Sequence, residues 1–211
     1  MRRRAILDAA GAMLDEMPVA EISLNELSRR VGLAKSNVLR YFESREAILL
    51  ELLEALLDEW LAELTARLAA EIDPTRSPDE RAGRLAAVIA ETASSRRVLC
   101  DLFAAQATVL EYNVSVELAI AHKRAGLEDL GALADLMRHH LPELGVIGAH
   151  RACLLGGVLI GALWSHSRPS ASVLAAYDAD PALAVFRLDF TPALTDALTT
   201  VLRGVLAAPN G

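Results

Sequence analysis

The sequence predicts an all-α protein, and its composition and its residue pattern both support that fold class. Leu and Ala dominate the 211 residues, β-branched residues are comparatively sparse, and aromatic residues make up 4%. This mixture favours helices by intrinsic propensity. Apolar residues recur at helical intervals, and no segment shows the alternation typical of a strand. With 53% hydrophobic residues, the chain can bury a sizeable core.

The first 42 residues predict three short helices. Arg2 to Glu16 form an amphipathic helix that Met17-Pro18 end. Ser23 to Glu26 have the form of a capping box, which starts a second helix from Leu24 to about Val31. Gly32 follows where a chain leaving a helix commonly needs a positive φ.

The third helix is expected from about Lys35 to Phe42, with its apolar residues turned to the core. These inward residues are Val38, Leu39 and Phe42. The residues expected on its outer face are polar, and most can donate hydrogen bonds: Lys35, Ser36, Asn37, Arg40 and Tyr41.

Longer helices are predicted for the rest of the chain. Ser44 is a plausible N-cap for a helix that runs to about Ile72, with an apolar stripe wide enough for a helical bundle. Ser77 to Glu80 form a second capping box. The further expected helices are Pro78 to Ser94, Arg96 to Glu111, Ser115 to Leu141, Val146 to Ser167 and Thr191 to Leu206. The segment 168–189 is the least regular, and only a short helix after Asp180-Pro181 is expected there.

The formal net charge of −7 is distributed unevenly along the chain. Residues 1–46 carry a net charge of +1, and the remainder carries −8. Screening over roughly 8 Å lets a local basic patch bind a polyanion although the chain as a whole is acidic. The basic residues of the first 46 are Arg2, Arg3, Arg4, Arg29, Arg30, Lys35, Arg40 and Arg45.

Metal, redox and catalytic sites find little support in the sequence. Cys100 and Cys153 form no CxxC pair and have no His at metal-ligand spacing, which favours buried free thiols. The adjacent His139 and His140 point about 100° apart on a helix, so we expect them to interact with its carboxyl end. No Gly-rich phosphate loop, HExxH motif or nucleophile elbow is present. We therefore expect no catalytic residues, no metal and no cofactor.

Membrane insertion is not expected either. The chain opens without the apolar region of a signal peptide. The longest apolar run, Ala152 to Trp164, is too short for a hydrocarbon core of about 30 Å. The expected location is the cytoplasm.

Three short helices with a glycine between the second and the third match a helix-turn-helix. On the third helix, Lys35 and Arg40 can contact phosphate or guanine, and Asn37 can pair with adenine. Ser36 permits a close approach of the backbone, and the Tyr41 hydroxyl can donate to phosphate. Arg45, beside the amino end of the long helix, offers a further anion site.

The same segment resembles the DNA-binding domain of the TetR family of bacterial transcriptional regulators. The corresponding residues are Leu27-Ser28, Gly32-Leu33-Ala34, Ser36, Tyr41-Phe42 and Arg45-Glu46-Ala47-Ile48. The chain departs from the family pattern at Ala34, where Ser or Thr is usual, and at Leu39, where Tyr is frequent.

The resemblance implies a helix-turn-helix DNA-binding domain over residues 1–46 and a larger helical domain over 47–211 for effector binding and dimerisation. It also implies a homodimer on a pseudo-palindromic operator, repression, and release by an unknown small molecule. The residues expected to contact DNA are Lys35, Ser36, Asn37, Arg40, Tyr41 and Arg45.

The helical body contains candidates for a dimer interface and for a largely apolar effector pocket. Glycine inside an apolar helix costs about 1 kcal/mol relative to Ala, which a close helix–helix approach can offset. The helices Val146 to Ser167 and Thr191 to Leu206 are therefore expected to pack together across a four-helix dimer interface, as the resemblance implies. The expected interface residues are Gly156, Gly157, Gly161, Leu194 and Leu198. The alternative is that the glycines admit a neighbouring helix of the same chain. The candidate pocket residues are Phe103, Gln106, Leu110, Tyr112, His122, Met137 and Trp164.

Two other classes of function compete with a DNA-binding regulator. One is an enzyme, which the missing catalytic motifs argue against. The other is a helical protein-interaction or scaffold protein, whose basic end would be an ordinary solvated face. Only the DNA-binding regulator requires an affinity for duplex DNA that falls steeply with salt.

Overall fold

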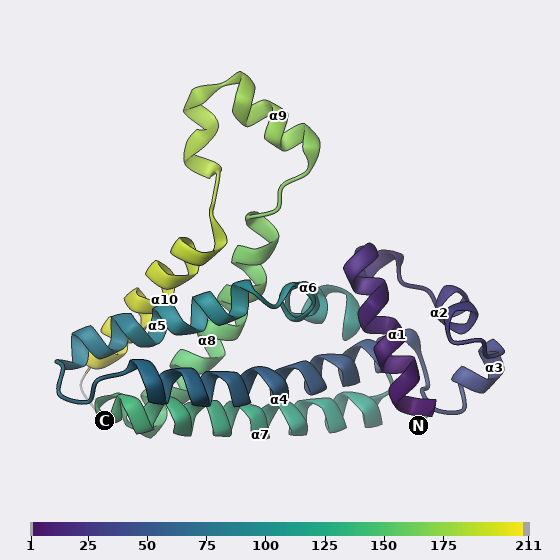
Figure 1. Cartoon of the computed structure of the whole chain (residues 1–211), viewed down its shortest axis with the longest axis horizontal. Helices are drawn as coiled ribbons and strands as arrows, with labels where there is room; N and C mark the ends of the chain where they lie inside the picture. Colours follow the sequence, from purple (N-terminus) through teal and green to yellow (C-terminus); the bar gives the residue numbers. More distant parts are fainter. Residues whose placement is uncertain (1, 209–211) are drawn as a thin grey trace. The chain divides into compact units, whose positions relative to one another are not determined.

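A computed structural model of the chain describes residues 2–208, which divide into two compact units. The first unit contains the described residues up to Trp60 together with Arg96–Asp129, and the second contains Leu61–Ser95 with the described residues from Leu130 onward. The long helices α4 (Arg45–Glu71) and α7 (Val116–His140) contribute to both units. Every regular element within residues 2–208 is helical, which confirms the predicted fold class (Figure 1).

These units differ from the predicted division at residues 46 and 47. The first unit includes not only the three short helices but also the first part of α4 and residues 96–129. The helix-turn-helix is therefore one part of a larger compact body.

Helix α1 forms the centre of the amino-terminal part of the first unit, and α2 and α6 pack against it. Figure 1 shows α1, α2 and α3 together near the amino terminus. The elements of this unit besides α4 and α7 are α1 (Arg2–Glu16), η1 (Val19–Glu21), α2 (Leu24–Arg30), α3 (Lys35–Val38), α6 (Arg97–Ala105) and η2 (Gln106–Leu110). Their core includes Ile6, Met13, Leu14, Leu27, Val38, Phe42, Ile48 and Leu49, each no more than 4% exposed.

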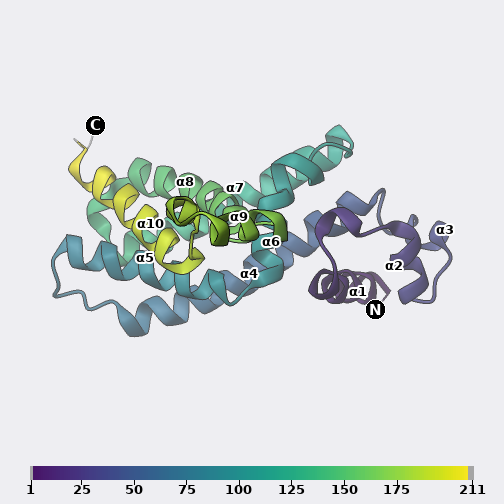
Figure 2. The ribbon, with the colours of Figure 1, turned by 90° about the horizontal axis from the view of Figure 1, so that it is seen from above.

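In the second unit, α10 lies between two other helices and buries one row of its leucines. It contacts both α5 and α8 (Figures 1 and 2). Leu194, Leu198 and Leu202 of α10 are at most 5% exposed. The elements of this unit besides α4 and α7 are α5 (Pro78–Ser94), η3 (Pro142–Leu144), α8 (Gly145–His166), α9 (Ala171–Ala179), η4 (Pro181–Phe186) and α10 (Phe190–Ala207).

Two glycines of α8 face α10 of the same chain. A Cβ on Gly156 would lie 3.4 Å from Leu198 Cδ2, which is an ordinary close contact. A Cβ on Gly148 would lie 2.5 Å from Val205 Cγ1, which is too close for any real side chain. Of these two glycines, Gly148 is the closer to α10, and no pattern in the sequence marks it.

The segment between α8 and α10, which the sequence left irregular, contains two helices. The short helix expected after Asp180-Pro181 is present as η4, and α9 precedes it. The Ser170 hydroxyl accepts a hydrogen bond from Val173 N at 3.4 Å and caps α9. Neither α9 nor η4 contains a buried residue.

Several predicted helix ends agree closely with the structure, and three local details differ. Helix α3 ends at Val38, and turns with hydrogen bonds such as Tyr41 N to Val38 O continue it. The helix expected to reach Glu111 is α-helical only to Ala105 and then becomes the π-helix η2. Ser23 caps α2 but Glu26 does not complete the box, whereas the box at Ser77 is complete.

The continuous helical stretch Pro142–His166 is the one helix within residues 2–208 that is long and apolar enough to cross a membrane, with a mean hydropathy of 1.7. The sequence predicts no membrane-crossing segment because its longest uninterrupted apolar run, Ala152 to Trp164, covers only part of this helix. One side of the helix packs against α10 in the second unit.

Gly148→Ala should destabilise the second unit, because the added methyl group meets the stiff, β-branched Val205 at 2.5 Å. Overpacking of this kind typically costs about 1–3 kcal/mol, which exceeds the gain in helix propensity of about 1 kcal/mol. Urea unfolding followed by circular dichroism measures the change.

Gly204→Ala in α10 is the matched control, since a Cβ there meets nothing within 4 Å. It should raise the stability by up to about 1 kcal/mol through helix propensity alone. Equal stabilisation by both substitutions would show that α8 and α10 are not in close contact at Gly148.

Candidate nucleic-acid interface

The outer face of α3 and of the turn that follows it is polar and accessible. Lys35, Ser36 and Arg40 are exposed, and Asn37 and Tyr41 are partly exposed. No ion pair is described for Lys35 or Arg40 within residues 2–208. Two cations without carboxylate partners therefore stand on one surface of an acidic chain.

The turn that positions α3 has the form that the sequence predicts. Gly32 adopts a φ of 65°, a conformation that residues with a Cβ rarely adopt. Leu33 N donates to Ser28 O at 3.0 Å, which satisfies a carbonyl at the end of α2. Helix α3 therefore leaves α2 through a tight glycine turn, as in a helix-turn-helix.

Phe42 holds this surface to the rest of the first unit. Its side chain is 4% exposed, and Val38 is fully buried. The guanidinium of Arg3 lies 4.4 Å from the centre of the Phe42 ring and donates to Tyr41 O at 2.8 Å. Arg3 also pairs with Glu51 of α4. One arginine of α1 thus joins the end of the α3 turn to α4.

Leu39 does not lie in the core, where the sequence placed it. It is 42% exposed. The apolar period of a regular helix, continued through Phe42, predicts a buried Leu39, but α3 ends at Val38. In the turn that follows, Leu39 lies on the accessible side with Lys35 and Arg40, so an apolar residue belongs to the candidate interface.

Arg45, which is expected to contact DNA, is hydrogen-bonded inside the first unit, and its contact with DNA stays a prediction. It donates to Ile22 O at 2.9 Å and to Glu46 Oε1 at 2.8 Å. Glu46 is only 7% exposed, so Arg45 compensates a buried carboxylate. Its role in the structure is to join the start of α4 to the chain before α2.

Helix α2 carries two further arginines that are already paired. Arg29 and Arg30 both bind Glu26, and Arg30 also binds Glu16 of α1 at 2.5 Å. The hydrogen bond from Arg29, followed by that from Arg30, lowers the pKa of Glu26 to about 2. Glu26 is therefore ionised at neutral pH and keeps both guanidinium groups close to α2.

The amino end of α4 is capped, and a nearby carboxylate ties the interface to α7. Ala47 N donates to Ser44 Oγ at 3.1 Å, which confirms the expected cap. Glu43, directly after Phe42, accepts from Ser115 N and from Ser115 Oγ, both at 2.9 Å. The start of α7 is thus hydrogen-bonded to the residue that follows the α3 turn.

A buried polar cluster lies deeper in the same unit. His122 is 5% exposed, with its Nδ1 2.9 Å from Glu54 Oε1 and its Nε2 3.0 Å from Gln106 Nε2. The Glu54 carboxylate can only accept, so it accepts from His122 Nδ1, and the side-chain amide of Gln106 lies at the other ring nitrogen. Burial, followed by repulsion from Asp58, raises the pKa of Asp129 in this unit.

The other candidate pocket residues are dispersed. Phe103 stacks edge-on against Trp60 at 6.5 Å between ring centres, Leu110 is fully buried, and Tyr112 is 77% exposed. Met137 and Trp164 belong to the second unit, where Met137 Sδ accepts from Cys153 Sγ and Trp164 stacks edge-on against Phe190. The structure brings Gln106 and His122 into direct contact, but it places Tyr112 at the surface.

The candidate interface residues also separate into buried and accessible ones. Gly156, Gly161, Leu194 and Leu198 are buried within one chain, and Gly157 is partly exposed. Gly156 thus admits Leu198 of α10 in the same chain, and the expected part of these residues in a dimer interface stays a prediction. The accessible apolar residues of α8 are Val146, Ile147, Leu154, Leu155 and Val158.

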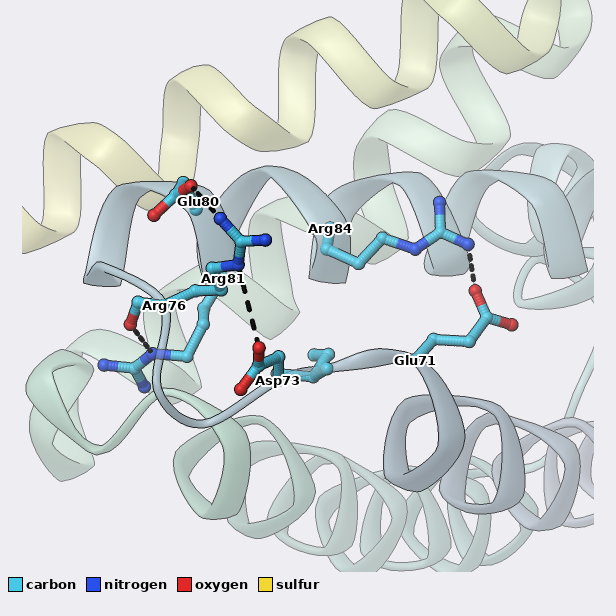
Figure 3. A pocket seen from close by; sticks show the side chains of 7 residues that line it. Glu71, Asp73, Arg76, Glu80, Arg81 and Arg84 are labelled. Carbon is cyan, nitrogen blue, oxygen red and sulfur yellow. Dashed lines mark hydrogen bonds and ion pairs between the residues drawn. The ribbon is translucent and has the colours of Figure 1, made fainter.

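A small cleft of about 290 Å³ lies in the second unit between the end of α4 and α5 (Figure 3). Its lining residues are Glu71, Ile72, Asp73, Arg76, Glu80, Arg81 and Arg84. Each of the three arginines is paired with a carboxylate: Arg76 with Glu80, Arg84 with Glu71, and Arg81 with Glu143. The cleft is an ion-pair network and contains none of the candidate pocket residues.

Two family models match the chain. Residues 6–52 match the model described as bacterial regulatory proteins, tetR family. Residues 54–209 match the model described as the tetracyclin repressor-like C-terminal domain. The boundary between the two models falls within α4.

Curated relatives match less than a third of the chain. The transcriptional regulator EthR of Mycobacterium tuberculosis is 36% identical over 58 residues, which are 28% of this chain and 27% of EthR. RutR of Escherichia coli is 35% identical over 65 residues, or 31% of each protein. The matched segments thus span less than a third of these relatives.

Solved structures resemble the whole chain in fold. A TetR transcriptional regulator from a Rhodococcus species has a TM-score of 0.63 at 15% identity, over 100% of this chain and 97% of that one. The fatty acid degradation regulator FadR of Bacillus halodurans has a TM-score of 0.54 at 14% identity, over 99% and 96%. At these identities the likeness establishes the fold alone.

Arg45→Ala should lower the free energy of unfolding by about 1–3 kcal/mol, because it removes charge-assisted hydrogen bonds and leaves Glu46 buried without that partner. Arg40→Ala, at an exposed position, should change it by less than about 0.5 kcal/mol. Urea titration of both variants tests the difference. An Arg45→Ala protein of normal stability that binds DNA poorly would instead place the Arg45 side chain on DNA.

Proposed function

The chain belongs to the TetR family of bacterial transcriptional regulators, and on that premise we propose that it is a repressor that binds a pseudo-palindromic operator as a homodimer. Members of the family are DNA-binding regulators and not enzymes. The observation that carries the proposal is the accessible surface of α3, where Lys35 and Arg40 lie without a described ion pair. We propose the cytoplasm as its location, since that is where bacterial DNA is reached.

On this surface the side chains divide into phosphate and base contacts. Lys35 and Arg40 supply positive charge to the phosphates, and Arg40 has the geometry for bidentate bonds to guanine. Asn37 suits adenine, and the exposed Leu39 suits the methyl group of thymine. Ser36 and Tyr41 contribute hydroxyl donors to the backbone of the duplex.

Dimerisation through the outer side of α8 would pair two such surfaces. This side of α8 carries three exposed apolar residues: Ile147 (67% exposed), Leu154 (59%) and Val158 (70%). Leu154 follows Ile147 by seven positions and Val158 follows Leu154 by four, so all three lie on one face of the helix. The outer side of α10 carries Asp196, Thr200 and Arg203, which are polar. A two-fold axis beside α8 therefore covers the apolar side and leaves the polar side of α10 in water.

We propose that a small, largely apolar effector releases the operator, with Gln106 and His122 as its polar anchors. Both nitrogens of His122 are already hydrogen-bonded, so such a ligand would replace Gln106 at Nε2. Gln106 opens a π-helix, a local distortion that is frequent at functional sites. A shift of α7 would reach the DNA surface through the bond between Ser115 and Glu43.

Repression follows from occupancy alone. A dimer on a promoter blocks the polymerase without a further protein contact. The effector can shift the equilibrium from the DNA-bound to the released conformation only by as much as it binds the released conformation more tightly.

Duplex binding tests the proposal directly. The chain should select a palindromic sequence from random DNA, and the logarithm of its binding constant should fall steeply with that of the salt concentration. Arg40→Ala should weaken binding to that sequence about 5- to 150-fold, equivalent to 1–3 kcal/mol. A changed base preference assigns Arg40 to a base, whereas a uniform loss assigns it to phosphate.

Arg138→Ala is the control, since Arg138 is a partly exposed arginine in the carboxyl-terminal part of α7, where it pairs with Asp135. Its affinity for DNA should match that of the unchanged chain. If the unchanged protein binds no duplex even at low salt, the proposal fails.

Leu154→Asp combined with Val158→Asp should convert the dimer to a monomer at micromolar concentration, because two charges would enter the centre of the interface. The affinity for a full palindrome should also fall, because a monomer contacts only one of its two half-sites. Sedimentation velocity measures the state of assembly.

Thr200→Asp on the polar side of α10 provides the comparison and should remain dimeric. A double Asp variant that is still a dimer would move the interface away from α8.

A further inference from the structure

The segment 168–189, here called the arm, projects from the second unit. It leaves α8, forms α9 and η4, and returns to α10, standing away from α5, α8 and α10 (Figure 1). None of its residues is buried. Its large apolar side chains are exposed nevertheless: Val173, Leu174, Val185, Phe186 and Leu188 are between 36% and 77% exposed.

The base of the arm is fixed, so its exposure is not that of a fraying chain end. Trp164 and Phe190, at the two ends of the arm, stack edge-on with 4.9 Å between their ring centres. Phe190 is 6% exposed, and the guanidinium of Arg168 lies 5.0 Å from the centre of the Trp164 ring. The arm is therefore a closed loop on a packed base.

The arm also has internal order. Arg187, which directly follows η4, pairs with Asp178 of α9 at 2.6 Å and lies 5.9 Å from the centre of the Tyr177 ring. Asp180 Oδ1 accepts from Ala182 N at 2.9 Å and caps η4. These contacts fold the two halves of the arm onto each other, and α9 packs on η4.

Exposed internal contacts of this kind contribute little to the stability of the arm in water. Isolated helices shorter than about 12–15 residues are marginal, and most helical stability in proteins comes from packing an apolar face. Helix α9 has nine residues, and none of them is buried. An ordered arm with exposed Val185 and Phe186 therefore requires a surface that its own chain does not provide.

The proposed dimer needs such an arm. A stable interface commonly uses about 20–30 residues from each partner. The line of α8 that faces outward offers Ile147, Arg151, Leu154, Val158, Ala162 and Ser165. These six residues and their neighbours are too few, and the polar outer side of α10 does not extend the apolar surface. The arm begins where this line ends and adds the exposed apolar side chains of Val173, Leu174, Val185, Phe186 and Leu188.

We infer that the arm packs on a second copy of the chain, with its apolar residues against the outer side of the partner's α8. The inference rests on the proposed dimer and extends it, because each chain then holds the other by an exchanged segment as well as by α8. Because a two-fold axis relates the two copies, the contacts that bury the arm of one chain also bury the arm of the other.

Charge favours the same arrangement. Helix α8 contains no Asp or Glu, and its outward line carries the exposed Arg151. The arm carries exposed Asp178, Asp180 and Asp189 against two arginines. An acidic arm over a basic helix face steers the two copies into register more than it adds affinity.

Site-specific crosslinking of the full chain tests the inference. Ala184→Cys introduces a small, exposed thiol next to Val185, and a benzophenone maleimide attached to it reacts with any neighbour under light. The native thiols stay silent, since Cys100 is fully buried and burial raises the pKa of Cys153 to about 12. Thr200→Cys, exposed on the polar side of α10, is the matched control.

The expected product of the Ala184→Cys protein is a covalent dimer at twice the 22.6 kDa chain mass, with its attachment sites between residues 146 and 165. The Thr200→Cys protein should give none. Sedimentation is measured on the same samples. A dimer whose crosslinks are all within one chain, or lie outside α8, overturns the inference and leaves the proposed dimer intact. A monomer overturns both.

A second variant tests the contribution of the arm without a label. Val185→Ser with Phe186→Ser removes two side chains that are 77% and 61% exposed in one chain, so the fold of that chain loses no core. The dissociation constant of the dimer should rise at least 10-fold. An unchanged constant would show that the tip of the arm contacts nothing in the dimer.

Discussion

The burial of Phe42 is the contact on which the candidate DNA surface depends. Helix α3 has four residues, far fewer than a helix needs to be stable by itself. Its orientation therefore comes from the side chains that anchor it, Val38 and Phe42, and from Arg3, which covers the Phe42 ring and binds Tyr41 O. Arg3 in turn pairs with Glu51 of α4, so the angle of α3 is set jointly by α1 and α4.

The basic residues of the amino-terminal part have two different functions that their sequence positions do not distinguish. Arg3, Arg30 and Arg45 bind carboxylates or backbone carbonyls and hold helices together. Lys35 and Arg40 stand on the open face of α3. An arginine next to a helix start looks the same in sequence whether it faces an anion or a buried Glu46. Only the fold decides, because it determines which carboxylates come within reach.

The helices were predictable wherever they bury one side, because burial produces the apolar period that a sequence shows. This holds for α1, α5 and α10, whose predicted limits lie within one residue of the observed ones. Helix α9 buries nothing, so it leaves no such period, and only its Ser170 cap marks it. Leu39 was misplaced for a related reason, since the period was extended beyond the true end of α3. The partner of Gly148 depends on tertiary packing, which no local pattern contains.

The shortness of α3 and the apolar outer side of α8 are two consequences of one requirement. A four-residue helix and its turn present few side chains to a groove, so one copy has little capacity to distinguish sequences. Two copies on one operator add their free energies of contact, provided that they stay together. Helix α8 is apolar on the side that packs against α10 and again on its outer side, a pattern that is costly in an acidic chain unless both sides are covered. Dimerisation would therefore have two effects at once. It would cover the exposed apolar residues of α8, and it would bring a second α3 to the operator.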